Sequence, residues 1–356
     1  MYKRFIGLFI TFLFLLGSIV CFIVYKLDPL HVYKLQENDY FYATERYQMP
    51  GLVKHRDYDT IFVGTSMGRN FLEPVADEAF HTKTFNASLP ASTAREQRMT
   101  ADLAIQKKEV QHVIWELNFY SFFGEPDWVL EGSSPFPTYM YDQNKLNDLQ
   151  YFFSPYSRQM AFKNWSSKLQ GYNPPEDLNW LYKFGDQEDK FLVENAIKVI
   201  EATEPAPPEE GYSYEILLKS FEDNIISFIK DHPDTQFTFF YSPYPVTTHV
   251  VNYKMDAEYL TTVLSFKKEV YNRLKEYNNV KLYDFHDNKE ITYNLSYYMW
   301  DQTHYYRFIN DWIISQLTTT PPINDGQAYE QRLAEFENTI KHFDTNELKN
   351  EDGKPM

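Results

Sequence analysis

The sequence contains a single cysteine, Cys21, among its 356 residues. No disulfide can form within the chain, and zinc sites built from cysteine pairs are excluded. The cysteine count does not decide between an oxidising and a reducing compartment, because proteins without disulfides occur in both.

Positive charge is also scarce, with 34 Lys and Arg residues against 50 Asp and Glu, which gives a net charge of −16. The basic residues form no cluster, so the chain lacks the electrostatic footprint of a nucleic-acid-binding protein. We therefore expect no nucleic-acid partner. Aromatic residues are abundant instead, with 29 Tyr and 29 Phe, which predicts a core dominated by bulky aromatic packing.

Charge is absent altogether from the 21 residues between Phe5 and Tyr25. At about 1.5 Å of rise per residue, a helix of this length covers a bilayer core of about 30 Å. A Lys-Arg pair precedes the run and Lys26 follows it, and the positive-inside rule applied to the pair places the N-terminus in the cytoplasm. The sequence therefore predicts a single-pass protein of the cell membrane, with residues 1–26 as a signal-anchor helix and the main domain extracytoplasmic.

A cleaved signal peptide is the alternative interpretation of this run. The apolar core of a signal peptide is normally shorter, and no small-x-small cleavage site follows Tyr25. Lipoprotein processing at Cys21 would require small residues before it, where the chain has Ile19 and Val20. The signal-anchor interpretation is favoured.

Beyond a juxtamembrane segment at 27–56, short apolar runs rich in β-branched and aromatic residues alternate with helical patterns. Strands are predicted at 58–63, 81–85, 110–117, 236–241 and 280–285, and helices at 94–107, 215–230, 257–277 and 305–317. This alternation predicts an α/β domain over residues 57–320, with a parallel sheet whose two faces are both covered.

Two segments depart from the alternation. Residues 124–211 are rich in Tyr, Trp, Asn and Pro and end in a proline-rich loop, which predicts an insertion over one end of the sheet, with a lid as one interpretation. Residues 321–356 are acidic and highly charged, with one helical pattern from Tyr329 to His342. This C-terminal segment is predicted to be a solvated helix or tail.

Polar residues follow the predicted strands at their carboxyl ends, where open parallel sheets bind their ligands. Ser66 lies at a strand-to-helix turn, where a helix N-terminus favours a developing negative charge. Asp301 and His304 lie three residues apart after the last strand, so one turn can carry an acid and a base. Asn86 and Asn118 follow the second and third strands and are candidate amide donors to an oxyanion.

Each of these residues also has a structural interpretation. Ser66 and Asp301 can cap the helices that follow them, and Asn86 and Asn118 can satisfy loop backbone. The order of the residues at successive strand ends favours catalysis. The acidic and histidine residues at 284–287 are a sparse metal candidate and are equally typical of a polar strand end, so we expect no metal and no cofactor.

These residues together resemble the SGNH hydrolase superfamily, and particularly its membrane-anchored envelope branch. That branch includes protein D of teichoic-acid D-alanylation and the acetyltransferase-like proteins of exopolysaccharide O-acetylation. The likeness covers roughly Asp57–Leu317, without the insertion. It rests on Val63-Gly-Thr-Ser66, Phe85-Asn86, Asn118, Leu282-Tyr-Asp-Phe285 and Asp301-Gln-Thr-His304. It implies a flavodoxin-like three-layer sandwich with a central parallel sheet of about five strands, beside the one N-terminal transmembrane helix.

The resemblance also implies roles: Ser66 as the nucleophile, His304 as the base and Asp301 as the group that orients it. The sequence departs from the family pattern at three blocks. Thr65 replaces an aspartate, Asn86-Ala-Ser replaces a block that offers a glycine N–H, and Glu116-Leu-Asn-Phe keeps only the asparagine of the third block.

Arg69 follows the predicted nucleophile at a distance of three residues. A guanidinium here can recognise an anionic substrate through bidentate hydrogen bonds. A structural surface arginine is the other interpretation, and it is slightly favoured.

The sequence thus predicts a serine esterase or acyltransferase that acts on an acylated cell-envelope polysaccharide or a teichoic-acid-like polymer. The expected partners are the membrane, through the N-terminal helix, and an envelope glycopolymer or acyl donor. The alternative is a non-catalytic binding or assembly protein that keeps the fold and partners a membrane acyltransferase.

Overall fold

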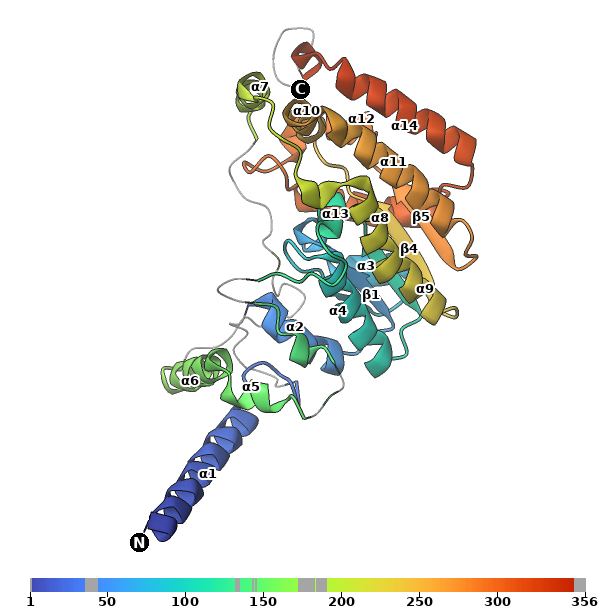
Figure 1. Cartoon of the computed structure of the whole chain (residues 1–356). Coiled ribbons are helices and arrows are strands. Elements are labelled where there is room, and N and C mark those ends of the chain that lie inside the picture. Colours follow the sequence, from blue (N-terminus) through green and yellow to red (C-terminus); the bar gives the residue numbers. More distant parts are fainter. Residues whose placement is uncertain are drawn as a thin grey trace.

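The computed structural model describes residues 2–35, 44–131, 135–142, 144, 146–171, 183 and 191–348. Within these residues the chain forms an α/β structure around one parallel sheet of five strands, in the order β2-β1-β3-β4-β5 (Figure 1). The strands are β1 (Thr60–Val63), β2 (Thr84–Asn86), β3 (His112–Glu116), β4 (Gln236–Tyr241) and β5 (Val280–Asp284). The expected α/β class and parallel sheet are confirmed.

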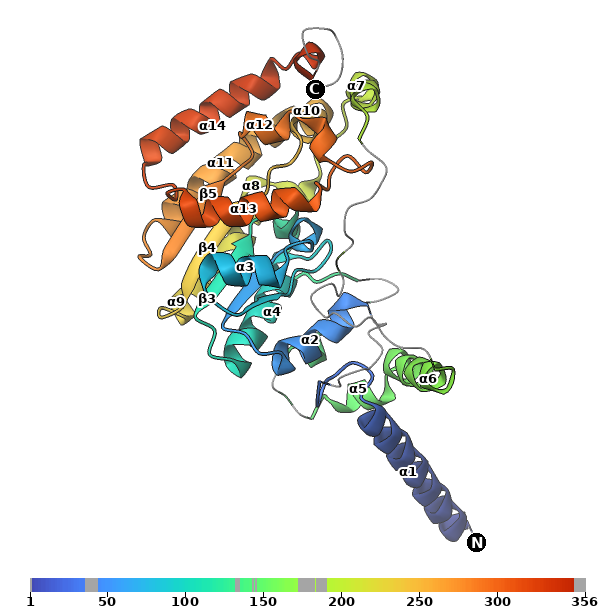
Figure 2. The same cartoon turned by 180° about the vertical axis from the view of Figure 1, so that it is seen from behind.

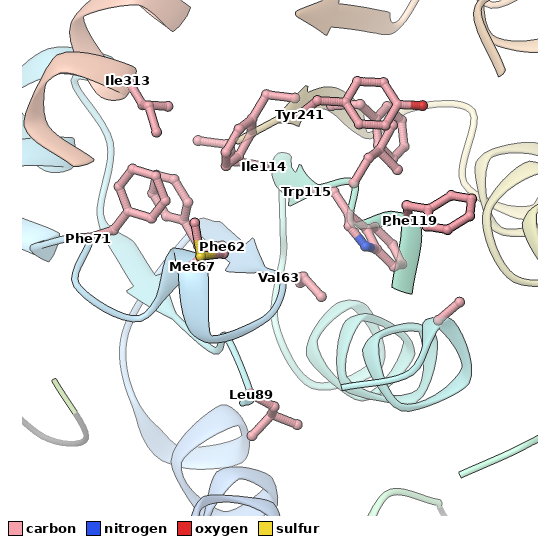
Figure 3. Close-up of a cluster of buried hydrophobic side chains, with 14 of the residues drawn as sticks. Phe62, Val63, Met67, Phe71, Leu89, Ile114, Trp115, Phe119, Tyr241 and Ile313 are labelled. Carbon is pink, nitrogen blue, oxygen red and sulfur yellow. The ribbon is translucent and has the colours of Figure 1, made fainter. Parts of the chain in front are cut away.

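The central strands are buried on both faces of the sheet. Successive strand residues point to opposite faces, and Val113, Ile114 and Trp115 of β3 are all 0% exposed. Aromatic residues fill much of this core, as their abundance predicts. Figure 3 shows part of it, where Phe62 and Phe71 stack with ring centroids 4.8 Å apart.

Helices surround the sheet and extend away from it (Figures 1 and 2). Their bounds are α1 (Tyr2–Leu27), α2 (Glu45–His55), α3 (Glu73–Phe80), α4 (Ala94–Lys107), α5 (Leu149–Phe153), α6 (Pro155–Leu169), α7 (Val193–Ala202), α8 (Tyr214–Phe221), α9 (Ser227–Asp231), α10 (Val246–Met255), α11 (Ala257–Leu274), α12 (Lys289–Thr292), α13 (Arg307–Thr319) and α14 (Gly326–Lys341). The short 3-10 helices η1 (Ser66–Gly68) and η2 (Phe119–Phe122) follow β1 and β3.

The N-terminal helix α1 has 26 residues and is long and apolar enough to cross a membrane, by its length and composition. The most apolar window of the helix is 0% buried within the chain. Figures 1 and 2 both show α1 projecting away from the sheet. A helix with an apolar surface on all sides, most of which no protein covers, is suited to a lipid environment.

The predicted insertion contributes α5, α6 and α7 to the described residues. Helices α5 and α6 both contact α1, whereas α7 contacts α10. Figures 1 and 2 place α5 and α6 at the domain end of α1, away from the sheet. The lid interpretation stays a prediction, because residues 172–182 and 184–190 of the insertion lie outside the described residues.

Candidate active site

The structure brings Ser66, His304 and Asp301 into one hydrogen-bonded line. Ser66 begins η1, directly after β1, and its Oγ lies 2.7 Å from His304 Nε2. His304 Nδ1 lies 2.6 Å from Asp301 Oδ2. The two ends of this line are more than 230 positions apart in sequence, and the distances are those of hydrogen bonds ready for proton transfer.

A tight turn between β5 and α13 presents the histidine. The N–H of Met299 donates to the carbonyl of His304 at 2.7 Å, and Tyr298 pairs with Tyr305 as an isolated antiparallel bridge. Gln302 takes a left-handed backbone conformation with φ of 64°, which closes the turn at a cost of about 1 kcal/mol for a residue with a Cβ. The backbone contacts of this turn therefore fix the position of the His304 imidazole.

Both carboxylate oxygens of Asp301 are held. Oδ1 accepts the N–H groups of Thr303 (3.0 Å) and His304 (2.9 Å), while Oδ2 faces the imidazole. Burial alone would raise the pKa of Asp301, but these donors outweigh it and the pKa falls below its ordinary value. An ionised carboxylate at Nδ1 keeps the proton on that nitrogen and presents the lone pair of Nε2 to Ser66.

A second carboxylate supports the turn that carries Ser66. The backbone N–H and the hydroxyl of Thr65 donate to Glu116 Oε2 at 2.7 and 2.8 Å. Gly64 must be glycine here, because a Cβ would lie 2.7 Å from the same carboxylate oxygen. Burial raises the pKa of Glu116, and the donors of Thr65 and Asn118 together with the charge of His304 oppose that rise.

The sequence prediction missed this role of Glu116. The signal that was available is its position at the carboxyl end of β3, beside β1 in the sheet. The register of the two strands places Val63 opposite Trp115, so the residues that follow them, Gly64 and Glu116, meet at the sheet edge.

The turn that carries Ser66, which we call the nucleophile turn, is also hydrogen-bonded to the segment that carries His304. The carbonyl of Met67 accepts the hydroxyl of Tyr305 at 2.9 Å and the side-chain amide of Asn310 at 3.1 Å. Tyr305 directly follows His304. The positions of Ser66 and His304 are therefore fixed relative to each other by these bonds to the Met67 carbonyl as well as by their own hydrogen bond.

Asn118 lies beside the turn that carries Ser66, and its role as an oxyanion donor stays a prediction. Its amide nitrogen is 2.6 Å from the hydroxyl of Tyr244 and 3.3 Å from both Thr65 Oγ1 and Glu116 Oε1. Tyr244 joins the site from the loop after β4, and its role was also missed. Among the described residues, no group accepts the backbone N–H of Ser66, which makes that N–H the clearest candidate donor to an oxyanion.

Asn86 holds a loop together. Its amide nitrogen donates to the carbonyls of Gly68 (2.8 Å), Phe71 (3.0 Å) and Arg69 (3.2 Å), and its carbonyl oxygen accepts the N–H of Ser88. These contacts match the structural interpretation of Asn86. Its role as an oxyanion donor stays a prediction, which no described contact supports.

The guanidinium of Arg69 forms an ion pair with Glu45 of α2 at 2.8 Å. Both side chains are only partly exposed, at 14% and 23%. The pair ties the nucleophile turn to α2, so a structural contact of Arg69 is established. Recognition of an anionic substrate by Arg69 stays a prediction.

In the metal candidate at 284–287, basic side chains contact the two carboxylates. Lys267 Nζ lies 2.6 Å from Asp284 Oδ2, and Arg332 donates to both carboxylate oxygens of Asp287. In the part of the chain that the structure describes, no group of three or more His, Cys, Asp or Glu side chains is arranged to hold a metal ion.

Neither a comparison with protein-family models nor one with curated proteins found a match for this chain. The class of site therefore rests on its geometry. A hydroxyl, an imidazole and a carboxylate in line, with a backbone N–H beside the hydroxyl, form the arrangement of a serine nucleophile activated by a base.

Proposed function

We propose that the chain is a membrane-anchored, extracytoplasmic serine esterase or acyltransferase related to the SGNH hydrolases. The single observation that carries the proposal is the hydrogen-bonded line from Ser66 Oγ through His304 to Asp301. In this arrangement the imidazole removes the proton of the hydroxyl and the carboxylate stabilises the imidazolium that forms.

The sheet supports the proposed family. The strand order 2-1-3-4-5 is that of flavodoxin-like folds, in which ligands bind outside the carboxyl ends of the strands. We infer that helices on both faces complete a three-layer sandwich over residues 57–320. Thr65 occupies the position of the family's aspartate, and Glu116 places a carboxylate beside it from the neighbouring strand.

The geometry supports the following reaction. Ser66 Oγ attacks the acyl carbonyl while its proton passes to His304 Nε2, and the N–H of Ser66 stabilises the oxyanion. His304 then protonates the alcohol oxygen of the substrate as the ester C–O bond breaks, which leaves an acyl-serine. Water or a sugar hydroxyl, deprotonated by the same imidazole, attacks the acyl-serine and releases Ser66. Hydrolysis and acyl transfer differ only in this acceptor.

The substrate class rests on the location. Helix α1 would cross the membrane, and the Lys-Arg pair before its apolar run favours a cytoplasmic N-terminus. A tethered catalytic domain gains access to polymers at the membrane surface, whereas a diffusing metabolite requires no tether. We therefore propose an acylated envelope polysaccharide or teichoic-acid-like polymer as the substrate.

The test is the reaction of the full-length protein in detergent with a fluorophosphonate probe, which labels activated serines. We expect labelling at Ser66, located by mass spectrometry, that is lost in Ser66→Ala and in His304→Ala. The matched controls are Ser296→Ala and His342→Ala, which replace exposed residues of the same types and should label like the wild type.

Absence of labelling in a folded wild-type protein would contradict the proposal. So would labelling that survives Ser66→Ala. Either result would favour the alternative, a non-catalytic binding or assembly protein that partners a membrane acyltransferase.

A further inference from the structure

Helix α6 carries an exposed apolar face, which we define as Phe162, Trp165 and Leu169. These side chains are 66%, 49% and 69% exposed. Their spacing of three and four residues places them on one side of the helix, while Met160 and Ala161 are buried against the protein. A contiguous exposed apolar face on a folded domain marks an interaction surface.

This α6 face is continuous with the surface of α1. Helices α5 and α6 both contact α1 directly. The groove between α1 and α6 has a volume of about 570 Å³ and is lined by Val20 and Ile23 on one side and by Phe162 and Trp165 on the other. Apolar surface therefore continues from α1 to α6, with Lys26 and Arg158 as the charged residues of the groove.

Helix α5 reaches further along α1. A Cβ built on Gly17 would lie 3.6 Å from the ring of Phe153, the last residue of α5. Gly17 lies eight residues before Tyr25, the end of the uncharged run, which corresponds to about 12 Å along a helix. With a bilayer core of about 30 Å centred on that run, Phe153 lies at the depth of the hydrocarbon.

A buried carboxylate at the junction between α1 and the domain fixes the position of α5 relative to α1. Asp28 is 0% exposed, and its carboxylate accepts the N–H groups of Val32 (3.0 Å) and Tyr33 (2.9 Å) just beyond α1. The same carboxylate accepts the hydroxyl of Tyr151 in α5 at 2.9 Å. One buried group thus joins the end of α1 to α5.

We propose that α5 and α6 form a second membrane contact, in which the α6 face lies in the lipid bilayer at the interface on the side of the folded domain. Phe153 lies beside α1 in the acyl-chain region, and Trp165 lies near the headgroups, where tryptophan is enriched. The anchor and the domain then meet the bilayer as one body.

Charge and position together favour lipid as the occupant of this face. The chain has a net charge of −16, yet α6 contains Arg158, Lys163 and Lys168 and no acidic residue. Basic side chains beside an apolar face are suited to anionic lipid headgroups, which they reach by extending their long stems. A second copy of this acidic chain would also complement the basic side chains of α6, so it is the continuity of the α6 face with α1 that favours lipid as the occupant.

The experiment uses the full-length chain with Cys21→Ser, so that no native thiol remains, in nanodiscs of phosphatidylcholine and phosphatidylglycerol. Phe162→Cys and Leu169→Cys each receive a nitroxide, and collision rates are measured with oxygen and with a water-soluble nickel chelate. We expect oxygen to exceed the nickel chelate at both positions, as at the lipid-facing reference Ile10→Cys. The exposed control Lys341→Cys on α14 should show the reverse.

Nickel accessibility at 162 and 169 equal to that of Lys341→Cys would overturn the proposal, because the face would be in water. Low accessibility to both reagents would also overturn it, because a second copy of the chain would then cover the face. Quenching of native fluorescence by brominated lipids gives a label-free check. Trp165→Phe should lower the quenched fraction, and an unchanged fraction contradicts the membrane contact.

Discussion

The carboxyl group of Glu116 lies where burial disfavours its charge and where hydrogen bonds favour it. Thr65 donates twice to one oxygen, and Asn118 approaches the other. In Glu116→Gln an NH₂ group must face one of these donors, so a hydrogen bond is lost together with the negative charge near His304. Leaving one buried donor without its hydrogen bond costs about 1–3 kcal/mol. We therefore expect labelling of Ser66 to slow about tenfold to a hundredfold.

The control for this prediction is Glu96→Gln. Glu96 is also buried, and its carboxylate pairs with Arg46 at 2.9 Å and accepts the N–H of Leu130 at 2.7 Å. It should lower the unfolding temperature without slowing the labelling of the folded protein. Equal labelling rates for Glu116→Gln and the wild type would show that Glu116 has no positioning role.

Asp301→Asn tests the other carboxylate. An amide cannot hold the required imidazole tautomer, and in serine hydrolases with this arrangement such a change lowers the rate about 10⁴-fold. We expect a loss of that order in ester hydrolysis or in probe labelling, with the fold retained. A loss below tenfold would contradict the orienting role of Asp301.

The same variant makes a prediction about pH. The pKa of Asp301 is lowered in the fold, so its stabilising contribution is fully present above the ordinary Asp pKa of about 3.9 and disappears as pH falls through the lowered value. The difference in unfolding temperature between the wild type and Asp301→Asn should therefore shrink below about pH 4. A difference that grows on acidification would contradict the lowered pKa.

At this scale the sequence was informative wherever residues follow strand ends or lie close in the chain. Ser66 follows a strand, and Asp301 and His304 share one turn, so their candidacy needed no tertiary knowledge. Glu116 and Tyr244 stood at strand ends too, but their partners are set by the pairing of β1, β3 and β4. That pairing is a tertiary fact which local spacing does not contain.

At the scale of elements, α2 packs on the chain that follows α1. Gly51 lies inside α2, where alanine would ordinarily be favoured by about 1 kcal/mol. A Cβ at this position would lie less than 3.0 Å from the carbonyl oxygens of Leu30 and His31. Because backbone atoms cannot rotate away, we expect Gly51→Ala to lower the unfolding free energy by about 1–3 kcal/mol.

Thermal unfolding of the full-length protein in detergent measures this effect. The matched control is Gly7→Ala in α1, where no atom lies within 4 Å of the added Cβ. Gly7→Ala should leave the unfolding temperature unchanged or raise it. A Gly51→Ala protein as stable as this control would refute the close packing of α2.

A buried ion pair joins β5, α11 and α14. Lys267 Nζ lies 2.6 Å from Asp284 Oδ2, which also accepts the hydroxyl of Tyr329 at 2.8 Å. Removing one partner leaves a buried charge without compensation, so Lys267→Met should lower the unfolding free energy by about 3–5 kcal/mol. Its neighbour Lys268 forms an exposed pair with Glu330, and Lys268→Met should cost at most about 1 kcal/mol. Similar losses in the two variants would contradict the difference in burial.

The elements themselves were predictable in proportion to their periodicity. Helices α4, α11 and α14 and strand β4 coincide closely with their predicted ranges. The helix predicted at 215–230 contains a π-helical segment, Glu222–Ile226, in which the side-chain amide of Asn224 donates to the carbonyls of Pro126 and Ser220. Helix α2 was missed because Pro50 and Gly51 interrupt its pattern, and only its packing on the chain after α1 explains its presence.

At the scale of the whole molecule, α2 connects helix α6 to the candidate active site. The ring of Tyr156 in α6 lies 4.3 Å from that of Tyr47 in α2, and Glu45 of α2 pairs with Arg69 beside the nucleophile turn. Helix α1 was visible in the sequence as an uncharged run. The α6 face was not, because three apolar residues in an aromatic-rich insertion are unremarkable until the fold leaves them exposed.

The proposed membrane contact predicts how a truncated chain behaves. Removal of residues 1–27 takes away α1, including Val24, which is only 2% exposed in the full chain, and uncovers the groove beside α6. We expect the remaining chain, 28–356, to self-associate in water because the apolar surface beside α6 has lost its neighbour. Size-exclusion chromatography with light scattering, without detergent, measures the association.

Substitution identifies the surface responsible. In the truncated chain, Phe162→Ser, Trp165→Ser and Leu169→Ser together should restore a monomer, because they remove the α6 face. The matched control replaces three exposed apolar residues at the other end of the molecule, Leu192→Ser, Val199→Ser and Met255→Ser, which are 57%, 39% and 42% exposed. That control should still associate, since those positions adjoin neither α1 nor the groove. A monomeric unsubstituted chain, or equal rescue by both triple variants, would mean that α6 has no more affinity for apolar surroundings than the rest of the domain.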